Sequence, residues 1–129
     1  MAEAGQGFYP QQAPIDGYGN GGFRFANMSH RGSLLCLPTG MHKWEVKRAA
    51  EITMDSLGPV FAAADQIDVL FIGLGNEITG FDKTIRRALA DCAIIVEAIA
   101  TGGAVRTYNI LLAENRAVGA ALIAVETAR

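Results

Sequence analysis

The segment Val69-Leu70-Phe71-Ile72-Gly73-Leu74 is the strongest fold signal in the chain, because it is apolar throughout instead of alternating between apolar and polar residues. Two further short apolar runs follow it, at 93–99 and 117–125. Continuous apolarity over so few residues is typical of strands that are covered on both faces, as in a parallel sheet. The three runs therefore predict three buried parallel strands.

Helical segments separate these runs. Between the first two, apolar residues recur at the spacing of an amphipathic helix, namely Ile85, Ala88, Leu89 and Cys92. The basic residues of this segment fall on the other side of the same helix, namely Lys83, Arg86 and Arg87. Between the last two runs, Val105, Tyr108 and Leu112 repeat the pattern. The resulting β-α-β-α-β order predicts helices packed on a mostly parallel sheet with right-handed crossovers.

The front section predicts antiparallel structure. Phe23-Arg24-Phe25 alternates as a half-exposed strand should, and residues 33–37 are typical of a more buried strand. Leu37-Pro38-Thr39-Gly40 has proline second and glycine fourth, the preference of a type I turn. Residues 41–46 are therefore expected to return as a hairpin partner that extends or covers the sheet. Pro59 is tolerated only in the first turn of a helix, which favours a short helix over 56–64.

Together these patterns predict an α/β fold: a single three-layer domain over residues 15–129, with a mostly parallel mixed central sheet and an antiparallel N-terminal hairpin extension. Residues 1–14 are mainly Gly, Gln, Ala and Pro, with Phe8 and Tyr9 as their only large apolar anchors. They are expected to form a flexible arm, whose deletion changes the melting temperature by less than about 2 °C.

Composition excludes several classes of function. Of the 129 residues, 50% are hydrophobic and 19% are charged, which is typical of a globular domain. The net charge of -2 provides no basic stripe for nucleic acid and no polybasic patch for a membrane surface. The apolar runs are far shorter than the roughly 20 residues of a spanning helix. With no signal-peptide or transit-peptide pattern, the protein is expected to be cytoplasmic.

No catalytic residue, metal site or cofactor is expected from the reactive side chains. Cys36 and Cys92 form no CxxC pair, and both stand in apolar surroundings typical of buried free thiols. His30 and His42 lack the spacing of metal ligands. Ser29 and His30 could suggest a nucleophile and its base, but neighbouring residues on a strand point to opposite faces.

Ligand sites in open α/β sheets lie beyond the carboxyl ends of the strands, and two of these ends are unusual here. The first strand runs into the glycine-rich turn Gly73-Leu74-Gly75-Asn76. This turn is not a dinucleotide-binding fingerprint, because Ile78 stands where the third glycine of that motif is required. The second leads into Thr101-Gly102-Gly103, where Thr101 is a candidate N-cap for a helix with exposed first amides. A cleft for a small carboxylate or phosphate anion is predicted, lined by Gly73, Gly75, Asn76, Thr101, Gly102, Gly103, Arg106, Thr107 and Asn109.

A structural interpretation of the same residues stays open. Gly102 and Gly103 could serve only to bring helix and sheet together, and Arg106 could pair with an internal acid. The acids within range by sequence are Glu77, Asp82 and Glu97.

Three blocks of sequence resemble a known family. The first is Gly22-Phe23-Arg24-Phe25 with Ser29-His30-Arg31-Gly32-Ser33-Leu34-Leu35, Pro38-Thr39-Gly40 and Trp44. The second is Val69-Leu70-Phe71-Ile72-Gly73-Leu74-Gly75, and the third is Thr101-Gly102-Gly103-Ala104-Val105-Arg106-Thr107-Tyr108-Asn109-Ile110-Leu111-Leu112-Ala113-Glu114-Asn115-Arg116. They resemble the small family that includes a mitochondrial respiratory complex I assembly factor and the adipogenesis-associated domain protein, with many uncharacterised bacterial and archaeal homologues.

This resemblance implies a three-layer α/β fold around a mixed sheet and a role in assembly through protein contact. The chain departs from the family pattern at Ala100, where methionine is common, and at Val105, where cysteine is common. Val105 argues against thiol chemistry at that helix. Two hypotheses follow: a non-catalytic assembly module that binds a protein partner, with His30, Arg31 and Trp44 on its contact surface, or a binder of a small molecule or anion, or an enzyme, that uses the cleft.

Overall fold

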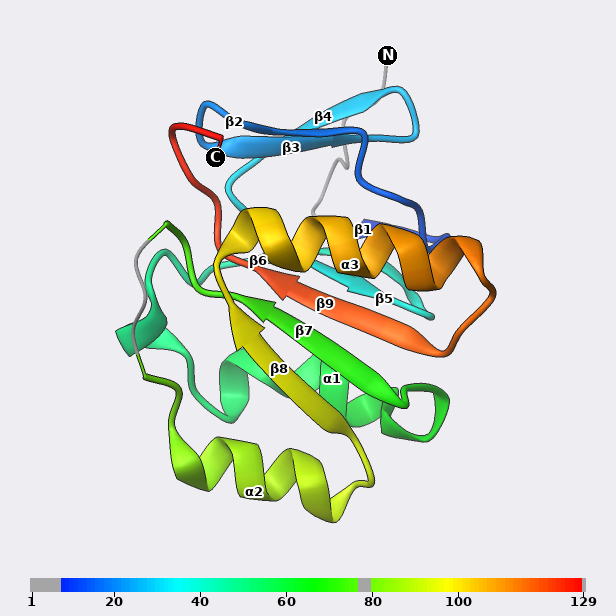
Figure 1. The fold of residues 1–129 in the computed structure, drawn as a ribbon, viewed down its shortest axis with the longest axis vertical. Coiled ribbons are helices and arrows are strands. Elements are labelled where there is room, and N and C mark those ends of the chain that lie inside the picture. The colour runs from blue at the N-terminus through cyan, green and yellow to red at the C-terminus, as the bar shows by residue number, and fades with distance from the viewer. Residues whose placement is uncertain (1–7, 77–79, 129) are drawn as a thin grey trace.

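A six-stranded mixed sheet forms the centre of the chain in a computed structural model, which describes residues 8–76 and 80–128 (Figure 1). Across the sheet, the strands lie in the order β1 (Phe8–Tyr9), β6 (Gly40–Trp44), β5 (Ser33–Leu37), β9 (Val118–Leu122), β7 (Val69–Gly73) and β8 (Ile95–Ile99). β7 pairs in parallel with β8 on one side and with β9 on the other. The three apolar runs therefore form three parallel strands, as predicted, but burial on both faces is wrong for β8, which lies at the edge of the sheet with Ile95 65% exposed.

The front hairpin extends this sheet rather than covering it. β5 and β6 are antiparallel and joined at Pro38 and Thr39, where Leu37 pairs with Gly40. β5 also pairs with β9 in the antiparallel direction, which attaches the hairpin to the parallel strands. The predicted α/β fold class is confirmed, with parallel pairing confined to the β9, β7 and β8 side of the mixed sheet.

Two apolar cores make the three layers, one on each face of the sheet. The helix α3 (Thr101–Ala113) lies over β7 and β9, and its buried residues include Val105 and Tyr108. The opposite face is covered by α1 (Gly58–Ala62), α2 (Lys83–Asp91) and three 3-10 turns, η1 (Ala49–Glu51), η2 (Asp55–Leu57) and η3 (Ala64–Gln66). Each face of β7 therefore lies against apolar side chains, which explains its unbroken apolar sequence.

The helices follow the sequence patterns closely. α1 is shorter than expected but carries Pro59 within its first turn. At the start of α2, the carboxylate of Asp82 accepts hydrogen bonds from the backbone N–H groups of Thr84 (2.7 Å) and Ile85 (3.2 Å), so Asp82 is the N-cap. Within the part of the chain that the structure describes, no helix combines the length and apolarity needed to cross a membrane.

A separate three-stranded antiparallel sheet, which the sequence analysis did not predict in full, lies beside α3 on the same face (Figure 1). Its strands are β2 (Gly17–Gly19), β3 (Gly22–Phe25) and β4 (Met28–Arg31). Two-residue turns connect them, and all four turn residues have positive φ, namely Asn20, Gly21, Ala26 and Asn27. Positive φ at both central positions defines the type I′ turn that suits a tight hairpin.

The expectation of a free arm over 1–14 is wrong for residues 8–14, whereas 1–7 lie outside the described residues. Phe8 and Tyr9 pair with β6 as an edge strand. The Gln12 side chain donates to the carbonyl oxygen of Val118 (2.7 Å), and Ala13 is buried. The chain gains backbone hydrogen bonds and apolar contact here, and these offset the entropy that was expected to keep the segment mobile.

The two cysteines differ in exposure, and the prediction that both are buried is wrong for Cys92. Cys36 is fully buried in β5, while Cys92 lies exposed just after α2. Cys92 sits at the C-cap of that helix, where the chain turns toward β8, so the apolar repeat of α2 ends before it. Burial raises the pKa of the Cys36 thiol far above its usual value.

We expect a thiol reagent to label Cys92 rapidly in the native protein and to reach Cys36 only after denaturation, because the thiolate is the reactive form and Cys36 is both neutral and inaccessible. Mass spectrometry after brief native labelling should show one adduct. The Cys92→Ser variant should show none until denaturant is added. Two rapid adducts on the native protein would contradict the burial of Cys36.

Candidate functional site

Thr101 lies at the centre of the predicted cleft, but its side chain is buried and bonds to the backbone on either side of it. The side chain is fully buried, and its hydroxyl donates to the carbonyl oxygen of Ile123 (2.7 Å). The same hydroxyl oxygen accepts from the backbone N–H of Gly75 (3.0 Å). The backbone N–H of Thr101 donates in turn to the carbonyl oxygen of Gly75 (2.9 Å). The N-cap of α3 is Ala100 rather than Thr101, so the expected capping role is wrong.

The glycines of this junction allow close packing. A Cβ on Gly73 would lie 2.9 Å from both Cα and Oγ1 of Thr101, a distance too short for carbon atoms. Gly75 has a φ of 91°, a conformation that favours glycine. At the start of α3, Gly102 is buried and a Cβ on Gly103 would touch Ile99 at 3.3 Å. These positions join β7, α3 and the segment after β9, which favours the structural interpretation.

Other predicted cleft residues also bond internally. The Asn109 side chain accepts from the N–H of Ile15 and donates to its carbonyl oxygen, both at 2.8 Å, and so holds the N-terminal segment. Asn76 donates to the carbonyl oxygen of Thr127 (3.0 Å). Thr107 donates to the carbonyl oxygen of Gly103 one turn earlier (3.1 Å). The structure therefore does not bring these side chains together around a shared opening.

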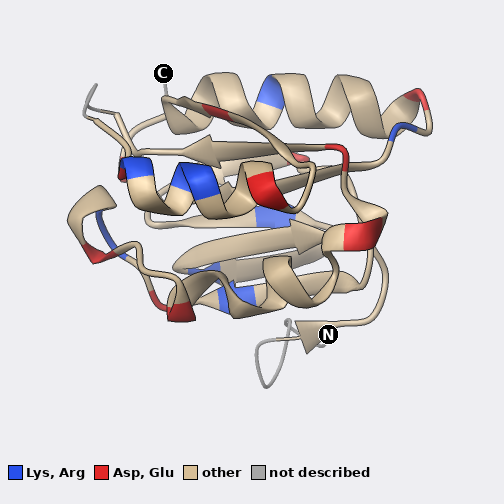
Figure 2. Ribbon diagram, turned by 90° about the horizontal axis from the view of Figure 1, so that it is seen from below, with Lys and Arg blue, Asp and Glu red and all other residues tan. Residues whose placement is uncertain are grey.

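Arg106 is exposed and makes no ion pair or hydrogen bond with the described residues, Asp82 and Glu97 included. It is the only charged residue within α3, as Figure 2 shows. Glu77, the third acid considered, lies outside the described residues. A link from Arg106 to Asp82 or Glu97 is therefore not formed.

We expect Arg106→Ala to change the melting temperature by less than about 2 °C, since exposed side chains without partners contribute little to stability. Thermal melts with and without phosphate, sulfate and citrate should also show no anion effect that depends on Arg106, because the neighbouring Thr101 and Asn109 side chains are already held in internal hydrogen bonds. A wild-type melt raised by one of these anions, with the rise lost in Arg106→Ala, would restore the cleft as a site.

The residues proposed for a contact surface are only partly exposed. His30 is 7% exposed and Trp44 is 4% exposed, so neither is available to a partner, and only Arg31 remains at the surface. The Trp44 indole N–H donates to the carbonyl oxygen of Ser56 (2.8 Å) inside the core beneath the sheet. His30 faces inward because β4 alternates strictly, with Ser29 and Arg31 outward.

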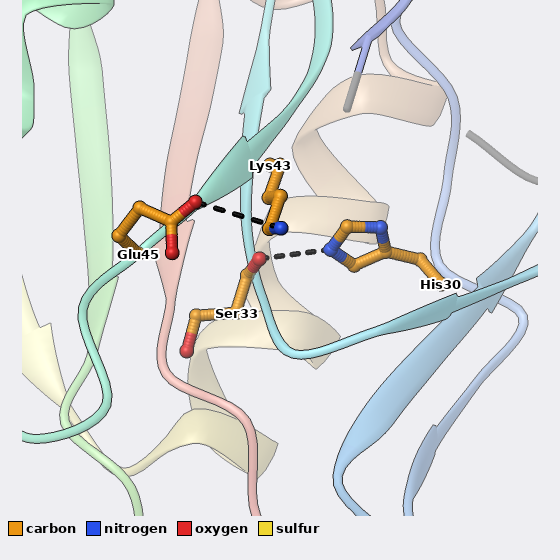
Figure 3. A network of polar contacts seen from close by, with 4 residues as sticks. All are labelled: His30, Ser33, Lys43 and Glu45. Carbon is orange, nitrogen blue, oxygen red and sulfur yellow. Dashed lines mark hydrogen bonds and ion pairs between the residues drawn. The ribbon is translucent and has the colours of Figure 1, made fainter. Parts of the chain in front are cut away.

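The junction of β4 and β5 is held by polar contacts (Figure 3). The ring Nε2 of His30 donates to the carbonyl oxygen of Ser33 (2.9 Å), and the Ser33 hydroxyl oxygen accepts from the backbone N–H of Ala124 (3.0 Å). Lys43 and Glu45 form an exposed ion pair of 3.5 Å alongside. A cavity of about 430 Å³ opens here, and its lining includes Lys43 and Lys47 together with Glu45 and Glu126, so its charges are mixed and Lys43 is already paired.

A second cavity, of about 490 Å³, lies over the small sheet and has a different chemical character. Its lining includes Gly17, Gly19, Gly22, Arg24, Ser29 and Arg31. Both arginines are exposed, and neither makes an ion pair with a described residue. Two guanidinium groups above a floor of glycine backbone can bind carboxylate or phosphate oxygens through paired hydrogen bonds. We call this the arginine cavity, and it is the best candidate site in the structure.

The arginine cavity was not predicted from the sequence, although a local signal was present. Asn20-Gly21 between two short alternating segments is the strongest short-range hairpin signal. Recognising that turn would have paired β2 with β3 and placed Gly17 opposite Arg24. Among residues 8–76 and 80–128, no three His, Cys, Asp or Glu side chains gather closely enough to hold a metal ion.

Comparisons with known proteins agree with this architecture. The family described as "Protein of unknown function (DUF498/DUF598)" matches residues 15–123. An uncharacterized protein of Rhodobacter capsulatus is 39% identical over 110 residues, which cover 85% of this chain and 83% of that protein. The mouse protein "NADH dehydrogenase [ubiquinone] 1 alpha subcomplex assembly factor 3" is 30% identical over 118 residues, which cover 92% of this chain but only 64% of the mouse protein.

A solved structure with a similar fold is that of a Bartonella henselae protein described as an outer membrane protein. It has a TM-score of 0.87 and 47% sequence identity, and the match covers 92% of this chain and 99% of that one.

Proposed function

The chain belongs to the family of proteins of unknown function DUF498/DUF598, and from this membership we propose that it is an assembly factor, which acts by protein contact while a respiratory NADH dehydrogenase is built. The observation that carries the proposal is the likeness to the mouse assembly factor over 92% of this chain. The shared part is therefore this whole α/β domain. The remaining third of the mouse protein has no counterpart in the match, so its contribution to assembly is not transferred.

The arrangement of polar side chains supports a role without catalysis. Ser29 points outward while His30 is buried, so the pair cannot act as nucleophile and base. Thr101 and Asn109 use their side chains to hold the fold. A cytoplasmic location, expected from the sequence, forms part of the proposal.

The test is carried out in the source organism. We expect a tagged copy of the chain to co-purify with subunits of the NADH dehydrogenase, measured by mass spectrometry against an unrelated tagged protein of similar size. We also expect a strain that lacks the gene to accumulate smaller forms of the enzyme on native gels and to lose NADH oxidation in its membranes. Full-size enzyme with normal activity in that strain would overturn the proposal.

A second function is favoured by one observation, the arginine cavity. Its volume of about 490 Å³ falls within the range of small-molecule sites. A free anion such as phosphate would then be the ligand. Isothermal titration of the purified protein with phosphate and with citrate measures this directly, and the absence of heat at millimolar concentrations would exclude it.

A further inference from the structure

The two faces of the small sheet differ sharply in character. Its inner face carries large side chains into the core shared with α3, including Phe23, Phe25 and Met28. On the outer face, the register aligns Gly17 with Arg24, and Arg24 with Ser29. A polar outer face is ordinary for a small sheet. Here, however, glycines stand next to the two arginines, and because they have no side chains, the backbone itself forms the shallow floor of the cavity.

Two glycines of the small sheet have different roles. A Cβ on Gly22 would collide with the carbonyl oxygen of His30, so this glycine allows the close approach of β3 and β4. A Cβ on Gly17 would lie 3.8 Å from Cδ of Arg24, which is ordinary contact, so the stem of that arginine lies across β2. The Arg24 side chain therefore rests on backbone that carries no side chain of its own at Gly17.

The charge at this face is unbalanced. The chain as a whole has a net charge of -2, yet Arg24 and Arg31 face the cavity with no carboxylate among its lining residues. The nearest acids on adjoining segments are Asp16, whose backbone N–H bonds to the carbonyl oxygen of Arg24, and Glu126, whose carboxylate lies beside Gly21. Neither makes an ion pair with Arg24 or Arg31. Among the described residues, no carboxylate therefore pairs with either arginine, which leaves both guanidinium groups able to pair with carboxylates of a partner.

We propose that the arginine cavity docks an extended, acidic segment of a partner protein, whose carboxylates pair with Arg24 and Arg31. Arg24 is aligned with Ser29, and Arg31 with Gly22, so the arginines are diagonal neighbours on adjacent strands. Such neighbours lie about 7 Å apart. In an extended peptide, side chains two residues apart on one face are also separated by about 7 Å. The favoured sequence therefore has two acidic residues separated by one other residue.

A peptide is favoured over a free anion because the floor is a shallow strip of sheet rather than an enclosed pocket. Such a strip has room for an extended chain to lie across it, and the arginines at two points can fix the register of that chain through its carboxylates. This inference rests on the proposed function, since it names the chemistry by which an assembly factor would hold its partner.

The test uses fluorescence anisotropy with a labelled ten-residue peptide of alternating Thr and Glu, and a matched peptide in which Gln replaces each Glu. We expect the Glu peptide to bind the wild-type protein and the Gln peptide to bind at least tenfold more weakly. Arg24→Ala and Arg31→Ala should each weaken binding of the Glu peptide about tenfold or more. Arg87→Ala is the control, because Arg87 is an exposed arginine on α2, across the main sheet, and it should bind as wild type does.

Opposite outcomes are distinct. Equal binding of the two peptides, or binding unchanged by both arginine substitutions, would overturn the inference. If phosphate displaces the peptide at lower concentrations than free glutamate does, the cavity is a small-anion site, and this result would also overturn the inference. Melting temperatures near that of wild type verify that the two variants are folded, as expected for exposed side chains.

A separate arm distinguishes this inference from the proposed function. The tagged Arg24→Ala/Arg31→Ala double variant is purified from the source organism beside the wild type. Loss of NADH dehydrogenase subunits from the double variant alone supports the docking surface. Subunits retained by both proteins overturn the docking surface and leave the proposed function standing. If neither protein retains them, the proposed function fails, and the peptide measurements still decide the binding chemistry of the cavity.

Discussion

Deleting residues 1–15 is expected to lower the melting temperature by about 10 °C more than deleting residues 1–7 alone, which corresponds to about 3 kcal/mol of unfolding free energy in a domain of this size. The difference isolates the segment 8–15. Its removal takes away Ala13 and Ile15, which are only 8% and 4% exposed. The apolar core side chains that these two residues cover then become exposed to water. It also takes away the backbone partners of Tyr108 and Asn109.

The hydrogen bonds of this segment identify where the stabilisation arises. The Tyr108 hydroxyl donates to the carbonyl oxygen of Ala13 (2.7 Å), and burial raises the pKa of that hydroxyl, so it stays neutral and remains a donor. Asn109 makes two hydrogen bonds to the backbone of Ile15. Asn109→Ala alone should therefore reproduce part of the loss, about 1 to 2 kcal/mol.

Thermal melts followed by circular dichroism measure both changes. Ile110→Ala is the matched control, because its side chain is next in sequence on α3 but is 58% exposed. It should melt within about 2 °C of the wild type. Melting temperatures of the two deletions that agree within about 2 °C would restore the flexible arm that the amino-acid composition suggested.

The parts of the fold that depend on local sequence patterns could be predicted from the sequence. β7 is apolar without interruption because helices and turns cover both of its faces, and that pattern is readable in six residues. The arm was misjudged for a nonlocal reason. Asn109 stabilises Ile15, which is 94 residues earlier in the chain, and no property of residues 8–15 alone shows that partner.

In the candidate site, too, some features follow from the local sequence and others depend on residues far away in the chain. Thr101 is of a residue type that is preferred at N-caps and stands where the helix begins, so the local sequence predicts that its side chain lies at the surface. Its hydroxyl is buried because it donates to the carbonyl oxygen of Ile123, which lies just after the end of β9. For the arginine cavity, the information was local but incomplete. The Asn20-Gly21 turn marks the first hairpin of the small sheet, whereas Ala26-Asn27 is an unusual choice for the second turn, because Ala26 adopts a φ of 49° there.

Thr101→Val is expected to lower the melting temperature by about 10 °C or more, although valine has nearly the same shape as threonine. The substitution removes one hydroxyl and leaves two buried backbone groups without their partner, the N–H of Gly75 and the carbonyl oxygen of Ile123. Each unsatisfied buried group costs about 1 to 3 kcal/mol, so about 3 to 4 kcal/mol is expected for the pair. Space for a bridging water is lacking, since Gly73 already approaches Thr101 too closely for a Cβ.

Thr101→Ser is the matched control, because serine keeps the hydroxyl and loses only a methyl group, at about 1 kcal/mol. Hydrogen exchange identifies the cause of any destabilisation. The amide of Gly75 should lose protection in Thr101→Val before the amides in the middle of β7 do, and should keep it in Thr101→Ser. If valine and serine destabilise equally, loss of the hydroxyl does not account for the effect, and the junction is instead sensitive to any change in side-chain packing at this position. If Thr101→Val melts within about 2 °C of the wild type, the strand ends are joined by packing alone, and the cleft predicted between β7 and α3 could open without unfolding the domain.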